Sequence, residues 1–233
     1  MQSTLPLYAI PGLGMTPEIF TRLRLAHGPI RPVAWIEPDD PQETFDHYCL
    51  RLSAQIDHHG PINLIGMSFG GMVAQRLARM LPVRQVVLVS TIKTSDEKPP
   101  WLRLMQQVPL YRFHYRWGRN GTRALWAPRF GIDTSEFVEF CQPMFDGHSD
   151  QYFRWAVRQI VHWHNPTHPA HTLHLHGDAD EIFPTRYLGQ HTNLAGGDHF
   201  MVYKRADEIS RLINAYLTQP EDHPSQSPHS LVS

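Results

Sequence analysis

The feature that most constrains the fold of this chain is one ten-residue stretch, residues 62–71, which reads INLIGMSFGG. Three of its first four residues are apolar and predict a short buried strand, and the mainly apolar residues 72–78 that follow predict a helix. Between the two lies the pattern Gly66-x-Ser68-x-Gly70, with the serine at the apex of a tight turn. A strand, a strained turn with serine at its apex and a helix together indicate a nucleophile elbow, which lifts the serine hydroxyl clear of the sheet.

The two glycines of this turn, Gly66 and Gly70, have a physical role. The residues two before and two after the serine face each other across the turn, so a side chain at either position would clash. A pentapeptide of this kind also arises by chance in glycine-containing loops. The strand before it and the helix after it are therefore what favour the elbow.

The composition is that of a globular protein with one ordinary α/β domain. Of the 233 residues, 41% are hydrophobic and 18% are charged, and the formal net charge is −1. This charge gives no field that would attract nucleic acid. The two cysteines, Cys49 and Cys141, form neither a disulfide framework nor a thiolate metal site. We see no signal peptide and no apolar run near the ~20 residues of a membrane span, so we expect a cytoplasmic protein.

Strands and helices alternate along most of the chain. Short apolar runs predict six strands, at residues 7–10, 32–36, 62–65, 85–90, 172–176 and 192–195. Amphipathic segments predict helices at residues 16–28, 43–56, 72–78 and 206–217. Because parallel strands need crossover helices, this alternation predicts an α/β fold with a doubly wound, mostly parallel sheet of about six strands.

The alternation stops after Ser90. Residues 91–165 contain many aromatic side chains and no convincing strand, and they predict helices at residues 102–108, 122–126, 135–144 and 151–163. We therefore expect residues 1–90 and 166–217 to form the α/β core, and residues 91–165 to form a helical cap insertion. The tail, residues 218–233, is rich in Pro, Ser, Gln and His, a composition typical of disorder.

Candidate functional residues follow directly after four of the predicted strands. They are residues 11–14, Ser68, Asp180 and His199. In a doubly wound sheet, chemistry is placed at the carboxyl ends of the strands. We therefore expect these residues to meet at one edge of the sheet.

Three separated motifs in this chain resemble those of the α/β-hydrolase superfamily, and the resemblance extends over residues 5–217. Residues 66–71 (GMSFGG) match the elbow, residues 177–184 (GDADEIFP) are similar to a G-x-x-D-x-x-x-P acid loop, and residues 196–200 (GGDHF) to a G-G-x-H-F histidine loop. The order serine, aspartate, histidine is that of the family. The resemblance implies a serine hydrolase with a helical cap. The first two strands usual in the family are missing, which points to a small, trimmed member.

The resemblance also implies a role for each residue. Ser68 is the nucleophile, His199 its general base, and Asp180 the carboxylate that orients and stabilises the imidazole ring. The backbone amides of Leu13 and Phe69 are expected to form the oxyanion hole. Many members of the family have His-Gly where this chain has Pro-Gly before Leu13, but a backbone donor does not need the histidine side chain.

Two assignments have competitors. Asp178 also follows the strand that ends before the acid loop, and it either binds the histidine or caps local backbone amides. The spacing to Pro184 favours Asp180. Histidine is abundant, with 16 residues, and His174 and His176 share one face of a strand near further histidines. No carboxylate stands in a ligand pattern with these histidines, so we expect neither a metal nor another cofactor.

The predicted cap carries an uneven charge. Residues 93–129 contain eight basic and two acidic residues, a local net charge of +6, and acidic residues predominate in residues 133–150. Two solvated faces that pair with each other explain this pattern. The alternative is that the basic segment recognises an anionic handle on the substrate, such as a carboxylate, coenzyme A or an acyl carrier. Seven aromatic residues of the cap line an apolar pocket over Ser68 or form the core of the cap itself. They are Trp101, Tyr111, Phe113, Tyr115, Trp117, Trp126 and Phe130.

Three functions are compatible with these residues. The first is a carboxylesterase-like serine hydrolase that cleaves a small-molecule ester through an acyl-serine intermediate. The second is a thioesterase or acyltransferase that uses the same three residues on a different acyl donor or acceptor. The third is a ligand-binding module without catalytic activity, because fold does not fix function. Dehalogenases and epoxide hydrolases of this fold use a carboxylate nucleophile, which Ser68 excludes.

Overall fold

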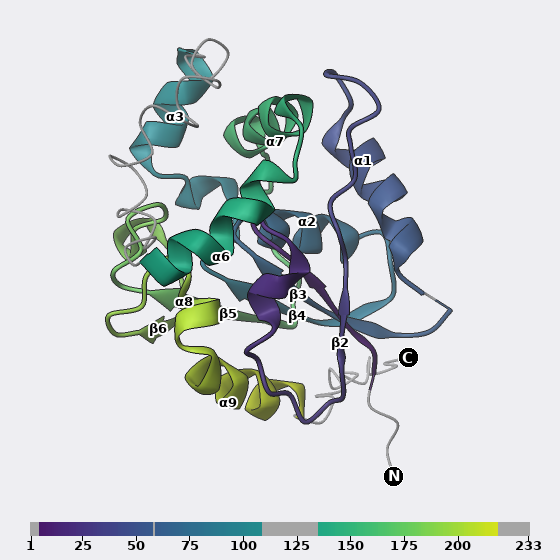
Figure 1. The fold of residues 1–233 in the computed structure, drawn as a ribbon, viewed down its shortest axis with the longest axis vertical. Coiled ribbons are helices and arrows are strands. Elements are labelled where there is room, and N and C mark those ends of the chain that lie inside the picture. The colour runs from purple at the N-terminus through teal and green to yellow at the C-terminus, as the bar shows by residue number, and fades with distance from the viewer. Residues whose placement is uncertain (1–4, 58, 109–134, 219–233) are drawn as a thin grey trace, which may run out of the picture.

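The computed structural model describes residues 5–57, 59–108 and 135–218. At its centre is one six-stranded sheet in which all neighbouring strands are parallel, in the order β2-β1-β3-β4-β5-β6 (Figure 1). The strands are β1 (Leu7–Ile10), β2 (Ile30–Pro32), β3 (Ile62–Met67), β4 (Val83–Val89), β5 (Thr172–Gly177) and β6 (Thr192–Leu194). The predicted fold class is therefore confirmed.

Helices cover both faces of this sheet. The α-helices are α1 (Phe45–Leu52), α2 (Phe69–Leu77), α3 (Pro100–Gln107), α6 (Ser135–Asp146), α7 (Asp150–His162), α8 (Met201–Lys204) and α9 (Ala206–Leu217). Short 3₁₀ turns are η1 (Pro17–Phe20), η2 (Ser53–Gln55), η3 (Ser95–Glu97) and η5 (Thr185–Tyr187). None of the helices in the described part of the chain is long and apolar enough to cross a bilayer.

The alternation of side chains along the strands creates two cores. In β1, Tyr8 and Ile10 point to the face covered by α1 and α2, whereas Leu7 and Ala9 point to the face covered by α8 and α9. All four residues are buried, as expected for strands of a parallel sheet with both faces covered. This is why the strands read as continuous apolar runs in the sequence.

The prediction of a helix over residues 16–28 is wrong. Only η1, Pro17–Phe20, forms there. The backbone amides of Arg24 and Ala26 donate to side chains of helix α9, at 2.9 and 2.8 Å, instead of to carbonyls of their own segment. These amides are thus satisfied by tertiary contacts, and the segment has no need of a helix.

The second strand lies earlier than the predicted residues 32–36. It spans Ile30–Pro32, and the chain leaves the sheet after Val33, whose amide donates to the Ala9 carbonyl at 3.0 Å. The amide and carbonyl groups of Ala34 and Ile36 are bonded by side chains from η2 and α1. Side-chain donors and acceptors therefore replace the sheet ladder for these residues.

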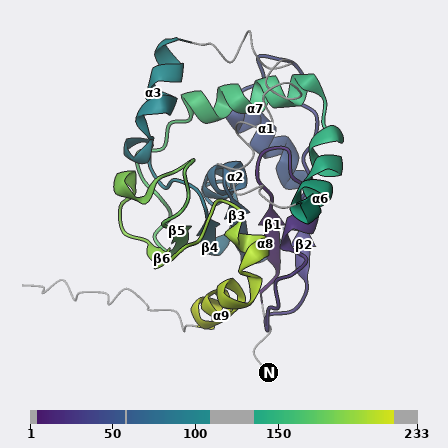
Figure 2. The same cartoon turned by 60° about the vertical axis from the view of Figure 1, so that its left-hand side comes forward.

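Between β4 and β5 the described chain forms helices, as predicted. Figure 2 shows α3 and α7 at the end of the molecule opposite to α9. The side chains of Tyr152, Trp155 and Val161 from α7 are buried in the same core as α1 and α2. Residues 109–134, including the predicted helix at 122–126, lie outside the described residues, as do residues 219–233. The division into core and cap remains a prediction.

Helix α7 is tied to the loop that precedes α1. The indole N–H of Trp155 donates to the Glu43 carbonyl at 2.8 Å, and Gln159 donates to the same carbonyl at 3.3 Å. Gln151 and Arg158 donate to the carbonyls of Pro38 and Pro41, and Ser149 donates to the Glu37 carboxylate. This helix is therefore fixed along its length to the α/β core.

The elbow packs backbone against backbone. A methyl group at Gly66 would overlap the Gly70 carbonyl and the Gly71 Cα atom. A methyl group at Gly70 would overlap the carbonyl oxygens of Ile10 and Pro11, at the end of β1. Glycine at these positions therefore allows the turn to lie directly on the loop after β1.

This contact predicts the effect of a single methyl group. Gly70→Ala should lower the free energy of unfolding by about 2 kcal/mol or more, because the opposing backbone cannot move aside without displacing β1. Urea unfolding followed by circular dichroism measures the change. Gly60→Ala is the matched control, since a methyl group there meets open space. Equal unfolding midpoints for the two variants would contradict the account.

Candidate active site

Three side chains from separate loops meet at the carboxyl ends of the strands. The ring of His199 lies with Nε2 3.0 Å from Ser68 Oγ and with Nδ1 2.8 Å from Asp180 Oδ2. Asp180 and His199 are 2% and 4% exposed, whereas Ser68 is only partly buried. The serine is thus the member of this group that solvent and a ligand reach most easily. The structure brings together the three residues that the sequence singles out.

The Ser68 backbone adopts an unusual conformation, with φ 52° and ψ −119°. Non-glycine residues rarely have positive φ, and such a conformation persists only where the surroundings enforce it. The Ser68 amide donates to the Val89 carbonyl at 3.0 Å, and its carbonyl accepts from Thr91 Oγ1 at 2.7 Å and from the Gly71 amide at 2.9 Å. These bonds hold the turn so that Oγ points to His199.

Both oxygens of the Asp180 carboxylate accept hydrogen bonds. Oδ1 accepts from the amides of Ile182 and Phe183, at 2.8 and 3.0 Å, and Oδ2 accepts from His199. Burial raises the pKa of Asp180, but the charge of His199 and hydrogen bonds from His176 and His199 outweigh it and hold this pKa well below its usual range. The carboxylate is therefore ionised at neutral pH and faces the imidazole as an acceptor.

Asp178, the competing acid, has a different role. It is exposed, and it accepts from the Gly196 amide at 2.6 Å and from the Asn193 side chain at 3.2 Å. The Gly196 amide lowers the pKa of Asp178. This residue thus links two loops, whereas the turn-forming interpretation predicts caps on local amides, and the carboxylate that bonds His199 is that of Asp180.

Sequence reasoning missed His176 as a neighbour of this group. Its Nε2 atom lies 2.8 Å from the Phe183 carbonyl and 3.3 Å from Asp180 Oδ2. The signal was present in the sequence, since His176 ends the predicted strand, four residues before Asp180. It was considered only as a strand residue and as a metal ligand.

The two amides expected to form an oxyanion hole belong to Phe69, which follows Ser68 in the chain, and to Leu13, which follows Gly12. Phe69 is the first residue of helix α2, so its amide has no acceptor within that helix. Gly12 packs on Ser68, because a methyl group built on it would lie 3.5 Å from the Ser68 Cβ atom. The next amide, that of Leu13, donates to no other residue in the described part of the chain. The Phe69 amide has no acceptor within its helix and the Leu13 amide has none among the described residues, so both can donate to a group bound beside Ser68.

Three histidine rings, two of them buried and one partly buried, form a cluster. His174, His176 and His191 have ring centroids 5.4 to 6.0 Å apart. Each ring already bonds a backbone carbonyl, at 3.0, 2.8 and 2.7 Å respectively. Burial lowers the pKa of His174 well below its usual value, so this ring is neutral. The cluster is explained as packing behind the acid loop.

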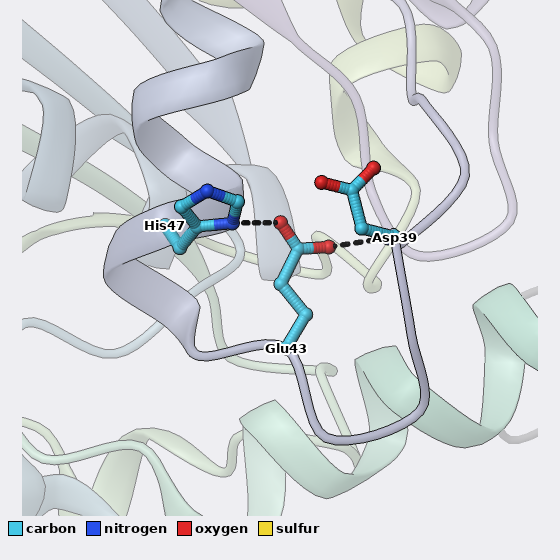
Figure 3. Close-up of side chains that lie close together, drawn as sticks. All are labelled: Asp39, Glu43 and His47. Carbon is cyan, nitrogen blue, oxygen red and sulfur yellow. Dashed lines mark hydrogen bonds and ion pairs between the residues drawn. The ribbon is translucent and has the colours of Figure 1, made fainter.

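Asp39, Glu43 and His47 are the group of potential metal ligands found among the described residues (Figure 3). Arg51 satisfies both carboxylates, with its guanidinium 2.8 and 2.9 Å from the Glu43 oxygens and 3.0 Å from Asp39. Burial raises the pKa of Glu43, but hydrogen bonds from Arg51, the Asp39 amide and His47 hold it below its usual value. The group is an ion-pair network that orders the loop bonded by α7.

The described part of the basic segment has structural roles. The ammonium groups of Lys93 and Lys98 are buried and donate to the carbonyls of Gln190 and Val161. Arg103 donates to the carbonyls of Lys98 and Asp96. The remaining five arginines lie in residues 109–134, outside the described residues, so recognition of an anionic handle stays a prediction. Of the aromatic residues that we expected to line a pocket or the cap core, only Trp101 is described.

A hollow of about 640 Å³ lies at the other edge of the sheet, between residues 20–30 and Asn214. Asn214 bonds the backbone of Arg24 and Ala26 there, and β2 begins at the adjoining Ile30. Since all strands are parallel, this hollow is at their amino ends, away from Ser68.

Comparison with known proteins decides the family. A family model described as "Alpha/beta hydrolase family" matches residues 7–212. The chain belongs to the alpha/beta hydrolase family. No curated protein matches the chain in sequence.

Solved structures of other proteins share the fold of this alpha/beta hydrolase. A thermophilic esterase from Thermogutta terrifontis has 18% identity and a TM-score of 0.66, over 91% of this chain and 89% of that chain. A bromoperoxidase from Bacillus anthracis has 16% identity and a TM-score of 0.63, over 92% of each chain. An epoxide hydrolase from Bacillus megaterium has 13% identity and a TM-score of 0.67, over 94% of each chain. Because these names cover different reactions, the likeness shows the fold alone.

The two aspartates of the acid loop provide a matched pair of variants. Asp180→Asn keeps an oxygen for the amides of Ile182 and Phe183 but presents an NH₂ group to His199, which favours the wrong tautomer. Ester turnover should fall about 10³- to 10⁴-fold. Asp178→Asn keeps its acceptor for the Gly196 amide and should stay within about twofold of wild type, by comparison with that loss.

The measurement is kcat/KM of both variants on one activated ester, with circular dichroism to show that both fold. Equal losses in the two variants, or a fully active Asp180→Asn enzyme, would contradict the assignment of Asp180.

Proposed function

We propose that this alpha/beta hydrolase cleaves small-molecule carboxylic esters through an acyl-serine intermediate. The observation that carries the proposal is the unbroken chain of hydrogen bonds from Ser68 Oγ through His199 to Asp180, at 3.0 and 2.8 Å. A serine hydroxyl is a weak nucleophile at neutral pH, and an adjacent oriented base is what activates it. Esterases among the proteins of similar fold support the same reaction class.

Acylation of the serine is the first half of the reaction. Ser68 Oγ attacks the ester carbonyl carbon while His199 Nε2 accepts the hydroxyl proton. The carbonyl oxygen becomes an oxyanion, which the amides of Leu13 and Phe69 stabilise together with the positive end of helix α2. Collapse of this intermediate breaks the bond to the alkoxy oxygen. His199 returns the proton to that oxygen, and the alcohol leaves.

Hydrolysis of the acyl-serine is the second half. Water attacks the acyl carbon while His199 Nε2 accepts one of its protons. Collapse then breaks the bond to Ser68 Oγ, the proton returns to the serine, and the carboxylic acid leaves. Asp180 stays ionised throughout and stabilises the imidazolium that forms twice in each cycle.

Aromatic rings from the helices between β4 and β5 support an apolar acyl group. A methyl group on Gly14 would overlap the rings of Phe145 and Phe153, so both rings lie directly on the loop after β1 that contains Leu13. Apolar walls next to a few polar groups are typical of small-molecule sites. Thioesters present the same carbonyl to the same residues and are therefore included in the test.

The proposal is tested with a panel of p-nitrophenyl esters and acyl thioesters. Ser68→Ala should lower kcat about 10⁴-fold or more, because neither His199 nor Asp180 can form the acyl-serine intermediate. The matched control is Ser53→Ala. This serine is buried, and its hydroxyl donates to the Leu50 carbonyl in helix α1, away from the site.

Each outcome has a distinct meaning. Turnover of esters that depends on Ser68 but not on Ser53 supports the proposal. Turnover of thioesters alone would favour a thioesterase with the same mechanism. Turnover that is unchanged in Ser68→Ala would overturn the mechanism, and wild-type protein without activity on the whole panel would favour a ligand-binding module.

A further inference from the structure

We propose that Trp35 is a positioning residue of the oxyanion hole, an inference that rests on the proposed function. Its indole N–H donates to the Gly12 carbonyl at 3.0 Å. That carbonyl belongs to the peptide whose other end is the Leu13 amide, the expected donor to the oxyanion. By holding the carbonyl, Trp35 determines where the amide points.

The direction of the Leu13 amide depends on the geometry of one peptide group. The Gly12 carbonyl and the Leu13 amide share a planar trans peptide, so they point in opposite directions and rotate together. The carbonyl accepts two hydrogen bonds, from the Met15 amide at 3.0 Å and from Trp35 Nε1 at 3.0 Å. Two donors arriving from different elements define the plane of the peptide, and rotation of the plane would break both bonds.

The loop needs such an external anchor. The Leu13 peptide lies between Gly12 and Gly14, and Gly14 has a positive φ of 68°. Glycine neighbours leave a peptide freer to rotate than other residues do. The Met15 bond is local to the loop and would move with it, whereas Trp35 comes from the segment after β2.

Trp35 is itself held on several sides. Its ring stacks on the Phe69 ring, with centroids 5.2 Å apart and an interplanar angle of 26°. The rings of Tyr152 and Tyr48 lie 6.0 and 6.5 Å away. Phe69 supplies the second amide of the expected hole, so one aromatic stack connects both donors.

The hydrogen bond also affects the strength of the amide as a donor. Donation to the carbonyl of a peptide polarises the group, and in a chain of hydrogen bonds each bond strengthens the next. The Leu13 amide therefore becomes a better donor to negative charge. The benefit appears where charge develops, which is in the transition state and not in the bound ester.

The test removes the N–H group and keeps the ring. Trp35→Phe should lower kcat about 10- to 100-fold, less than the loss of an entire oxyanion-hole donor. KM should stay within about twofold, because the ground-state ester makes little use of this amide. Affinity for a trifluoromethyl ketone, which places an oxyanion in the hole, should fall by the same factor as kcat/KM.

The matched control is Trp155→Phe. This indole also donates to a backbone carbonyl, that of Glu43, and it is 1% exposed, so its loss is at least as disruptive to packing. It should lower the unfolding temperature without a matching fall in kcat. Equal kcat losses in the two variants, or a Trp35→Phe enzyme with normal kcat and normal ketone affinity, would overturn the inference.

The outcome is separable from the proposed function. Turnover that depends on Ser68 but not on Trp35 leaves the reaction in place and overturns only the role of Trp35. Wild-type protein without Ser68-dependent turnover overturns both.

Discussion

The close contact of backbone with backbone at Gly66 and Gly70 is the constraint on which the rest of the site depends. It lets the turn of Ser68 lie on the end of β1, so Ser68 and the loop expected to hold the oxyanion are placed by the same contact. The unusual φ and ψ of Ser68 cost about 1–3 kcal/mol, and the bonds from Val89 and Thr91 offset part of this cost. The strained turn is therefore held by the end of β4 and by Thr91 just beyond it.

Neighbouring residues hold the group formed by Ser68, His199 and Asp180 in place. Asp180 is held by two amides of its own loop and by His176 from the strand before it, so the acid cannot turn away from His199. The expected oxyanion peptide is held by Trp35 through an indole N–H. The bonds to Asp180 and to the Gly12 carbonyl make the site a rigid one, suited to a reaction that gains most from preorganised donors.

Much of this arrangement could be predicted from the sequence, and the reasons are local. Buried parallel strands read as apolar runs, and a glycine-flanked serine between strand and helix has few other interpretations. The failures came from long-range contacts. No local pattern indicates that the amides near Arg24 bond side chains of α9, or that side chains of α1 and η2 replace the sheet around Ile36. His176 and Trp35 were missed for the same reason, since each acts through one partner brought close only by the fold.

The most direct test of the central claim is to locate the activated nucleophile chemically. A fluorophosphonate forms a stable adduct with a serine that a neighbouring base activates, and peptide mass spectrometry identifies the modified residue. The account predicts one adduct per chain, on Ser68, formed in step with the loss of ester turnover and absent from Ser68→Ala. An adduct on another residue, or full turnover after Ser68 has been modified, would contradict it.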